Sequence, residues 1–231
     1  MSLSANMKIQ NLTLWYGKKN VLKWVSADFL PWEFVFLIGG SGSGKTSFIK
    51  SIIWDLKPKQ GTILTNSEKN LYKLSKRELL AYRRKIGIIF QDFKLLRNKT
   101  VRENVAFAME VCGYSDIIIH EKVPEILSQV GLLAKKDAFI ETLSGWEVQR
   151  VSIARALIHN PEIIIWDEPT GNLDPKNAKE IIDILLEINK QGKTILLATH
   201  DDRIVNALRK RVIAFEDGKI VSDMHDGIYC I

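Results

Sequence analysis

The stretch Val35-Phe-Leu-Ile-Gly39-Gly-Ser-Gly-Ser-Gly-Lys45-Thr46 decides the fold of this chain. Its first four residues form an unbroken apolar run, which is typical of a strand buried on both faces of a parallel sheet. The glycine-rich loop that follows leads into Thr46–Trp54, where apolar residues recur at helical spacing. Strand, loop and helix in this order, with G-x-x-x-x-G-K-[ST] in the loop, form the pattern that binds nucleotide phosphates.

The residue types of this loop suit phosphate chemistry. Glycines let the backbone curl around phosphates with its N–H groups pointing inward, and the helix N-terminus adds partial positive charge. We expect Lys45 to reach the terminal phosphates and the Thr46 hydroxyl to ligate Mg²⁺. The alternative is an ordinary flexible Gly/Ser loop, but the strand and helix around it favour a nucleotide site. The candidate ATP-binding residues here are Gly39, Gly40, Ser41, Gly42, Ser43, Gly44, Lys45, Thr46 and Ser47.

Other short apolar runs extend the same architecture. Strand-like runs alternate with amphipathic stretches of helical spacing, which indicates an α/β core with a mostly parallel sheet and flanking helices. The alternating opening, Lys8–Tyr16, predicts a half-exposed strand. The expected buried strands are Ile86–Phe90, Ile163–Trp166, Thr194–Ala198 and Val212–Phe215, and the expected helices include Val148–Ile158 and Ala178–Asn189.

The segment from about 93 to 142 has a different pattern. Val101–Val111 and Val123–Val130 show helical spacing, and strand signals are few. We therefore predict a single domain over residues 1–231, with a helical sub-domain inserted at about 93–142.

Two adjacent carboxylates end the apolar run Ile163–Trp166. Neighbouring strand residues point to opposite sides, so Asp167 and Glu168 can take different roles. We expect Asp167 to hold the Mg²⁺ shell and Glu168 to polarise the attacking water. Alone, such a pair is more often a solvated strand end. Together with a phosphate loop, it indicates nucleotide hydrolysis.

Composition excludes several classes of protein. The chain has 231 residues, 46% of them apolar and 26% charged, which excludes intrinsic disorder. Its two cysteines form neither a disulfide framework nor a zinc site. Neither a membrane span nor a signal peptide is recognisable, so we expect a cytosolic protein. The net charge of +6 suits an anionic partner, but the basic residues are scattered.

At this point the sequence resembles the ATP-binding-cassette (ABC) ATPases over nearly its whole length. Tyr16 sits where that family stacks an aromatic side chain on adenine, and Gln91 where its Q-loop glutamine senses Mg²⁺ and water. Leu143-Ser-Gly-Trp-Glu-Val-Gln-Arg150 resembles the signature LSGGQ, so Ser144, Gly145, Trp146 and Glu147 are candidates for contact across a dimer. Asn172-Leu-Asp174 resembles the D-loop, and His200 the switch histidine that contacts the γ-phosphate. The resemblance implies an N-terminal antiparallel β sub-domain and a homodimer enclosing two ATP molecules.

Two segments indicate which group of ABC ATPases the sequence resembles most. Glu168–Asp174 is similar to FtsE, lipoprotein-release and macrolide-export ATPases, whereas Phe90–Leu96 followed by Thr100–Ala106 is similar to the FtsE cell-division ATPases. This implies an FtsX-like membrane permease as partner, a place on the inner face of the membrane, activation of cell-wall hydrolases, and no nucleic acid. The alternatives are a lipoprotein-release or macrolide-type exporter, a cassette acting on nucleic acid, and a hydrolysis-poor regulatory cassette.

The tryptophans depart from the family pattern. Trp146 occupies the second glycine of the signature, and Trp32 and Trp54 also lie where the family usually has glycine; glycine would be tolerable at Trp15, Trp24 and Trp166. There are six tryptophans and only 14 glycines. Three explanations are open: a degenerate cassette, genuine tryptophans that the fold accommodates, or UGA codons that the source organism decodes as glycine. The last would raise the glycine count to 20.

Overall fold

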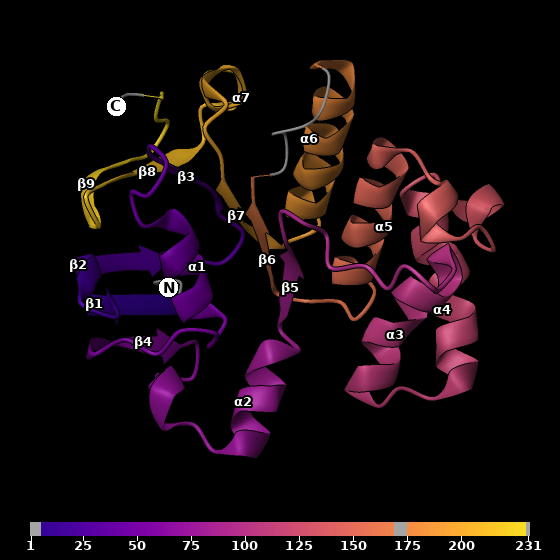
Figure 1. Cartoon of the computed structure of the whole chain (residues 1–231), viewed down its shortest axis with the longest axis horizontal. Coiled ribbons are helices and arrows are strands. Elements are labelled where there is room, and N and C mark those ends of the chain that lie inside the picture. The colour runs from indigo at the N-terminus through magenta and orange to yellow at the C-terminus, as the bar shows by residue number, and fades with distance from the viewer. Residues whose placement is uncertain (1–5, 169–174, 230–231) are drawn as a thin grey trace.

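The computed structural model describes residues 6–168 and 175–229, and its centre is a six-stranded sheet (Figure 1). The strand order is β5-β6-β7-β3-β8-β9, with all neighbours parallel except β8 and β9. The strands are β3 (Phe34–Ile38), β5 (Ile86–Ile89), β6 (Ile163–Asp167), β7 (Thr194–Ala198), β8 (Arg211–Glu216) and β9 (Lys219–Met224). The predicted α/β class is therefore confirmed, and each expected buried strand is present.

Both faces of this sheet are covered, which explains the unbroken apolar runs. In β3, Phe34, Phe36 and Ile38 face one hydrophobic cluster, while Val35 and Leu37 face the other. This alternation follows from the two-residue period of a strand. Helices α5 (Gly145–Leu157) and α6 (Pro175–Lys190) cover the first face, and α1 (Lys45–Ile52) covers the second. The sheet thus holds the loops after β3, β6 and β7 at one edge.

The N-terminal part forms a second, antiparallel sheet of order β2-β1-β4. Its strands are β1 (Met7–Tyr16), β2 (Lys19–Phe29) and β4 (Gln60–Thr65). Helix α1 lies between this sheet and the central one, with Phe48 touching the rings of Phe29 and Phe215. The β sub-domain implied by the family resemblance is therefore present.

Residues 93–142 contain α3 (Val101–Cys112), α4 (Asp116–Gln129) and the short 3-10 turns η2 (Leu133–Lys135) and η3 (Ile140–Thr142). Thr100 and Glu103 form a reciprocal capping box that fixes the start of α3. The helices gather beside α5, away from the N-terminal sheet (Figure 1). Their limits as a separate sub-domain stay a prediction.

Some elements are additional to those expected or differ in length. The sequence analysis did not place β2, β4, β9, η1 (Leu71–Lys73), α2 (Lys76–Arg83) or α7 (Asp202–Leu208). The helix predicted over Thr46–Trp54 ends at Ile52, because Trp54 has left-handed backbone geometry with φ 62°. Helix α4 begins at Asp116, before the predicted Val123.

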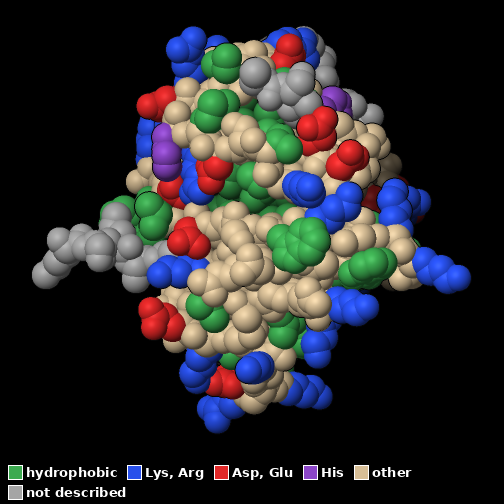
Figure 2. All heavy atoms as spheres, turned by 90° about the vertical axis from the view of Figure 1, so that its left-hand side faces the viewer, with side chains coloured by type: hydrophobic (Ala, Val, Ile, Leu, Met, Phe, Trp, Pro, Cys, Tyr) green, Lys and Arg blue, Asp and Glu red, His purple; other side chains and the backbone are tan. Residues whose placement is uncertain are grey.

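The face that carries β1, β2 and β9 has no single cluster of basic side chains among the described residues. On the side that carries β1, β2 and β9, Figure 2 shows lysine and arginine side chains distributed over the face, not gathered in one patch. No helix in the described residues is long and apolar enough to cross a membrane.

Candidate nucleotide-binding and catalytic site

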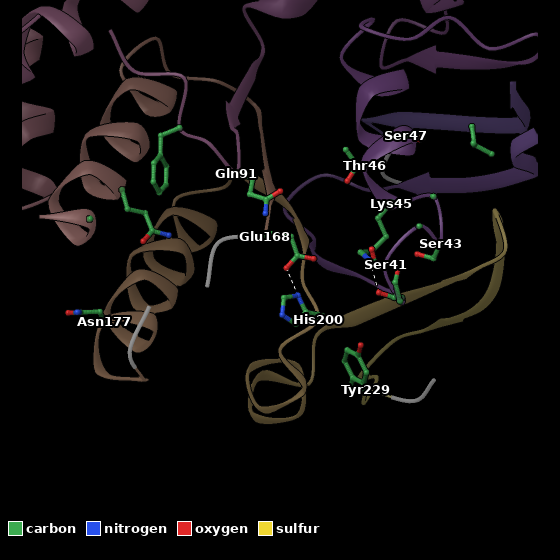
Figure 3. Close-up of a pocket in the computed structure, with 18 of the residues that line it drawn as sticks. Ser41, Ser43, Lys45, Thr46, Ser47, Gln91, Glu168, Asn177, His200 and Tyr229 are labelled. Carbon is green, nitrogen blue, oxygen red and sulfur yellow. Dashed lines mark hydrogen bonds and ion pairs between the residues drawn. The ribbon is translucent and has the colours of Figure 1, made fainter. Parts of the chain in front are cut away.

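A cavity of about 1160 Å³ lies at the edge of the central sheet where β3, β6 and β7 end (Figure 3). Its size suits a small organic ligand. Residues far apart in the sequence meet there, and most of them were predicted as site residues. Those predicted residues are Gly39, Gly40, Ser41, Gly42, Ser43, Gly44, Lys45, Thr46, Ser47, Gln91, Ser144, Gly145, Trp146, Glu168 and His200.

The phosphate loop needs its glycines. Gly39, Gly42 and Gly44 have φ values of 148°, 78° and 114°, where other residues are strained. A Cβ on Gly44 would lie 2.9 Å from Leu22 Cδ2. Gly44 also precedes α1 without any side-chain cap, so the helix N-terminus is available to an anion.

Lys45 is a buried cation held by the loop itself. Its Nζ donates to the carbonyl oxygens of Gly39 at 2.6 Å and Gly40 at 3.2 Å. Burial lowers the pKa of Lys45, and the carboxylates of Glu168 and Asp167 oppose this effect. A bound phosphate would supply a stronger, charged acceptor for the same ammonium group.

Asp167 and Thr46 carry oxygen atoms of the kind that a divalent cation takes as ligands. The Thr46 hydroxyl hydrogen-bonds to the Asp167 carboxylate, and burial raises the pKa of that carboxyl. Asp167 Oδ1 is buried without a hydrogen-bond partner. Within residues 6–168 and 175–229, His, Cys, Asp and Glu form no group of three or more that could hold a metal. The donor set fits Mg²⁺, which takes one or two carboxylates and completes its shell with phosphates and water.

Glu168 and His200, which the sequence suggested separately as the water-activating carboxylate and the switch histidine, lie side by side in the cavity. His200 Nδ1 lies 2.5 Å from Glu168 Oε2, as the dashed line in Figure 3 marks. The Glu168 N–H donates to Ala198 O at 2.9 Å, which holds Glu168 at φ 58°. Such left-handed geometry in a non-glycine residue marks stored strain, which proteins tolerate at functional positions. The Glu168 side chain is 17% exposed and that of His200 64%.

The signature segment forms the first turn of α5. Ser144 caps the helix, and its hydroxyl donates to Glu147 Oε2 at 3.0 Å within a capping box. Lys135 Nζ pairs with Glu147 Oε1 at 2.6 Å, so Glu147 supports the helix end and does not line the cavity. The guanidinium of Arg150 lies 4.1 Å from the ring centroid of Trp146.

Tyr16, Asp167 and Asp174 are the remaining predicted site residues. Tyr16 ends β1 with 72% exposure and does not line the cavity, although Lys19, its partner in β2, does. Asp167 is the last residue of β6 and is not among the residues that line the cavity. Asp174, the D-loop candidate, falls outside the described residues.

Sequence reasoning missed further lining residues, namely Lys19, Val21, Phe93, Gln149, Asn177 and Tyr229. Tyr229 reaches the cavity because its backbone N–H donates to Asn206 Oδ1 of α7 at 2.7 Å. Burial raises the pKa of Tyr229, with contributions from Asp202 and Glu168. No motif near the C-terminus signals this placement, so only the folded chain reveals it.

Comparison with known proteins defines the family to which this chain belongs. A family model described as ABC transporter matches residues 22–171, and the chain belongs to this family. It is an ATP-binding, ATP-hydrolysing enzyme.

Individual members of this family are similar to the chain over most of its length. The chain is 50% identical to the cell division ATP-binding protein FtsE of Bacillus subtilis, covering 90% of this chain and 91% of that one. The FtsE of Mycobacterium tuberculosis is 46% identical, with 85% of each chain covered. The methionine import ATP-binding protein MetN of Carboxydothermus hydrogenoformans is 40% identical, but only 65% of that protein is covered.

Solved structures give the same fold. CbiO1 of Clostridium perfringens superposes with a TM-score of 0.87 at 30% identity, covering 96% of this chain and 89% of that one. The ATP-binding cassette MJ0796, solved as a dimer bound to ADP and Pi, gives a TM-score of 0.85 at 32% identity, with 96% and 100% covered. The predicted fold, family and activity are thereby confirmed.

Proposed function

We propose that this chain is the ATPase subunit of an FtsE–FtsX-like membrane complex acting in cell division and cell-wall hydrolase activation. The observation that carries the proposal is the single cavity in which the phosphate loop meets Glu168 and His200. Several relatives that cover about nine-tenths of the chain are named cell division ATP-binding proteins, which supports the biological assignment.

The residues of the cavity define a mechanism of phosphoryl transfer to water. The N–H groups of the loop and the Lys45 ammonium bind the β- and γ-phosphates of ATP and stabilise the charge spread over the transferred group. Glu168 orients the attacking water and accepts its proton, while the pairing with His200 keeps the carboxylate directed into the cavity. Thr46 and Asp167, together with Gln91, would hold Mg²⁺, which would neutralise charge on the phosphate oxygens. The adenine ring is assigned to Tyr16, which lies outside the cavity lining but is exposed and pairs with the lining residue Lys19.

The functional unit in this proposal is a homodimer. The signature residues Ser144 and Gly145, with Asp174 of the D-loop, act on the ATP bound by the opposite subunit. Support comes from the dimeric state of the related cassette MJ0796 bound to ADP and Pi. Trp146 obstructs this arrangement, because an indole fills space that a second glycine would leave for the opposite nucleotide.

The membrane partner in this proposal is an FtsX-like permease that binds near Gln91 and the helical segment, on the inner face of the cytoplasmic membrane. Exposed apolar side chains on α3 and α4 support this surface: Phe107, Val111 and Ile117 are 43%, 65% and 81% exposed. No nucleic acid takes part. A lipoprotein-release or macrolide-type exporter is the second candidate, and no structural observation favours it over the first.

The test is recovery of the partner from the source organism. A tagged Glu168→Gln chain, which binds ATP without turning it over, is solubilised from membranes in ATP and Mg²⁺, with Lys45→Ala as the matched control that cannot hold ATP. The proposal expects a permease of the FtsX class with Glu168→Gln and less of it with Lys45→Ala. Recovery of an exporter permease, or of no membrane protein with either variant, would contradict it.

A further inference from the structure

Trp54 occupies a backbone position built for glycine. The Asp55 N–H donates to Lys50 O at 2.8 Å and the Trp54 N–H to Ser51 O at 3.2 Å, directly after α1. These two bonds form a Schellman motif, whose residue after the C-cap is left-handed and usually glycine because it lacks a Cβ. Trp54 takes that position with φ 62°.

Trp32 occupies a second such position. Leu30–Glu33 turn the chain between β2 and β3, with Pro31 followed by Trp32 at φ 68°. Proline followed by a residue of positive φ is the pattern of a type II turn, which favours glycine at the second of the two positions. Trp32 is 61% exposed, so little side-chain burial compensates for its backbone conformation.

Trp24 is the third. It has φ 54° and lies in β2, where the register against β1 shifts between the pairs Leu12–Val25 and Leu14–Leu22. This irregularity is a β-bulge, and the left-handed residue of a common bulge type is glycine. Trp24 is 64% exposed. Only a few per cent of non-glycine residues have positive φ, and a bulky side chain there is a genuine outlier. Three of the six tryptophans fall in this class.

Two of the remaining tryptophans are unfavourable for other reasons. Trp166 is fully buried in β6, and its indole N–H has no hydrogen-bond partner. A buried donor without a partner is costly, and tryptophan normally finds one. Trp146 lies in the signature turn, on the cavity that binds ATP.

We infer that the chain made in its source organism carries glycine where tryptophan is written at positions 24, 32, 54, 146 and 166. We extend the inference to position 15 because the same decoding rule would apply there, not because of its own geometry. A UGA codon, which some genetic codes assign to tryptophan, is decoded in that organism as glycine. Backbone geometry at Trp24, Trp32 and Trp54 carries this inference without reference to activity. Only the part concerning Trp146 rests on the proposed function, because glycine there restores the space that the opposite nucleotide requires.

The test is peptide mass spectrometry of the protein purified from the source organism, alongside sequencing of its gene. We expect glycine in all six peptides, an intact mass lower by six tryptophan-to-glycine differences, and UGA at all six codons. Peptides without a tryptophan position serve as the internal control and should match the written sequence. Tryptophan in the peptides that span positions 24, 32 and 54, or UGG at those codons, would overturn the inference.

The outcome is separable from that of the proposed function. Tryptophan at all six positions in a chain that hydrolyses ATP and binds a permease would overturn this inference alone. Glycine at all six in a chain that neither binds nor hydrolyses ATP would leave the inference intact and overturn the function.

Discussion

Replacing Trp54 by glycine and, separately, by alanine isolates the backbone contribution at the end of α1. Both variants lose the ring contact with Tyr72, whose centroid lies 5.0 Å from that of Trp54, so this loss cancels in the comparison. Any Cβ in left-handed geometry costs about 1–2 kcal/mol. Glycine loses about 0.5–1 kcal/mol more than alanine through the greater freedom of the unfolded chain. The difference leaves Trp54→Gly more stable than Trp54→Ala by roughly 1 kcal/mol.

Trp15 supplies the matched control. It is a half-exposed residue of β1 and does not have positive φ. At position 15 the free energy of unfolding should be higher for Trp15→Ala than for Trp15→Gly by about 0.5–1 kcal/mol, because only the effect of glycine on the unfolded chain remains. Urea titration gives the free energy of unfolding, and the thermal midpoints should differ by about 2–4 °C per kcal/mol in a chain of this size. Alanine as stable as glycine at position 54 would refute the reasoning.

Four further substitutions test charged groups at the site and next to it. Asp167→Asn should raise the thermal midpoint in the absence of nucleotide. Burial raises the pKa of this carboxyl, so its ionisation destabilises the folded chain. The gain in thermal midpoint should therefore appear as pH rises from about 4 through that raised pKa. Asp201→Asn should lower the thermal midpoint. Hydrogen bonds and the charge of Arg203 outweigh burial and lower the pKa of Asp201, so the ionised carboxylate contributes stability that is lost as pH falls through that lowered pKa. Equal shifts of the two variants' melting curves with pH would contradict both predictions. Lys45→Ala should abolish binding of ATP in equilibrium dialysis without lowering the thermal midpoint, since burial desolvates its ammonium, which donates to the carbonyls of Gly39 and Gly40. Retained affinity would exclude the assigned role. His200→Ala should lower kcat by about 10²-fold with little change in KM, because it removes a group that holds Glu168 in place, and an unchanged kcat in a coupled ATPase assay would count against the pair.

Five strands of the central sheet (β3, β5, β6, β7 and β8) were predictable because they are largely buried on both faces. Ile163–Trp166 and Thr194–Ala198 are unbroken apolar runs, and a strand that packs helices above and below has no polar face to interrupt the pattern. The phosphate loop was predictable for a related reason: its geometry tolerates few residue types, so the glycines and Lys45 stand at fixed spacing.

Other elements depend on contacts that no local pattern records. Strand β9 (Lys219–Met224) is mostly exposed and exists because it pairs with β8. Tyr229 reaches the cavity through a bond to Asn206, and nothing in its neighbours signals this. Glu168 and His200 could each be expected at the site from the sequence and the family resemblance, but their pairing, the left-handed backbone of Glu168 and the hydrogen bond that fixes it could not.

The tryptophans required both kinds of observation. Their number against 14 glycines was visible in the composition, and three of them stood at family glycine positions. The backbone angle at Trp24 adds a position that the sequence did not mark as typical of glycine. A residue type that is wrong for its backbone thus becomes evidence about the gene as well as about the fold.

The most direct test of the central claim is the rate of ATP hydrolysis by the Trp146→Gly chain with and without Glu168→Gln, at saturating ATP and Mg²⁺. If Glu168 is the group that activates water in this cavity, the second substitution should lower the rate by about 10²–10⁴-fold while the chain still binds ATP. Equal rates in the two chains would contradict the assignment of this site as the centre of hydrolysis.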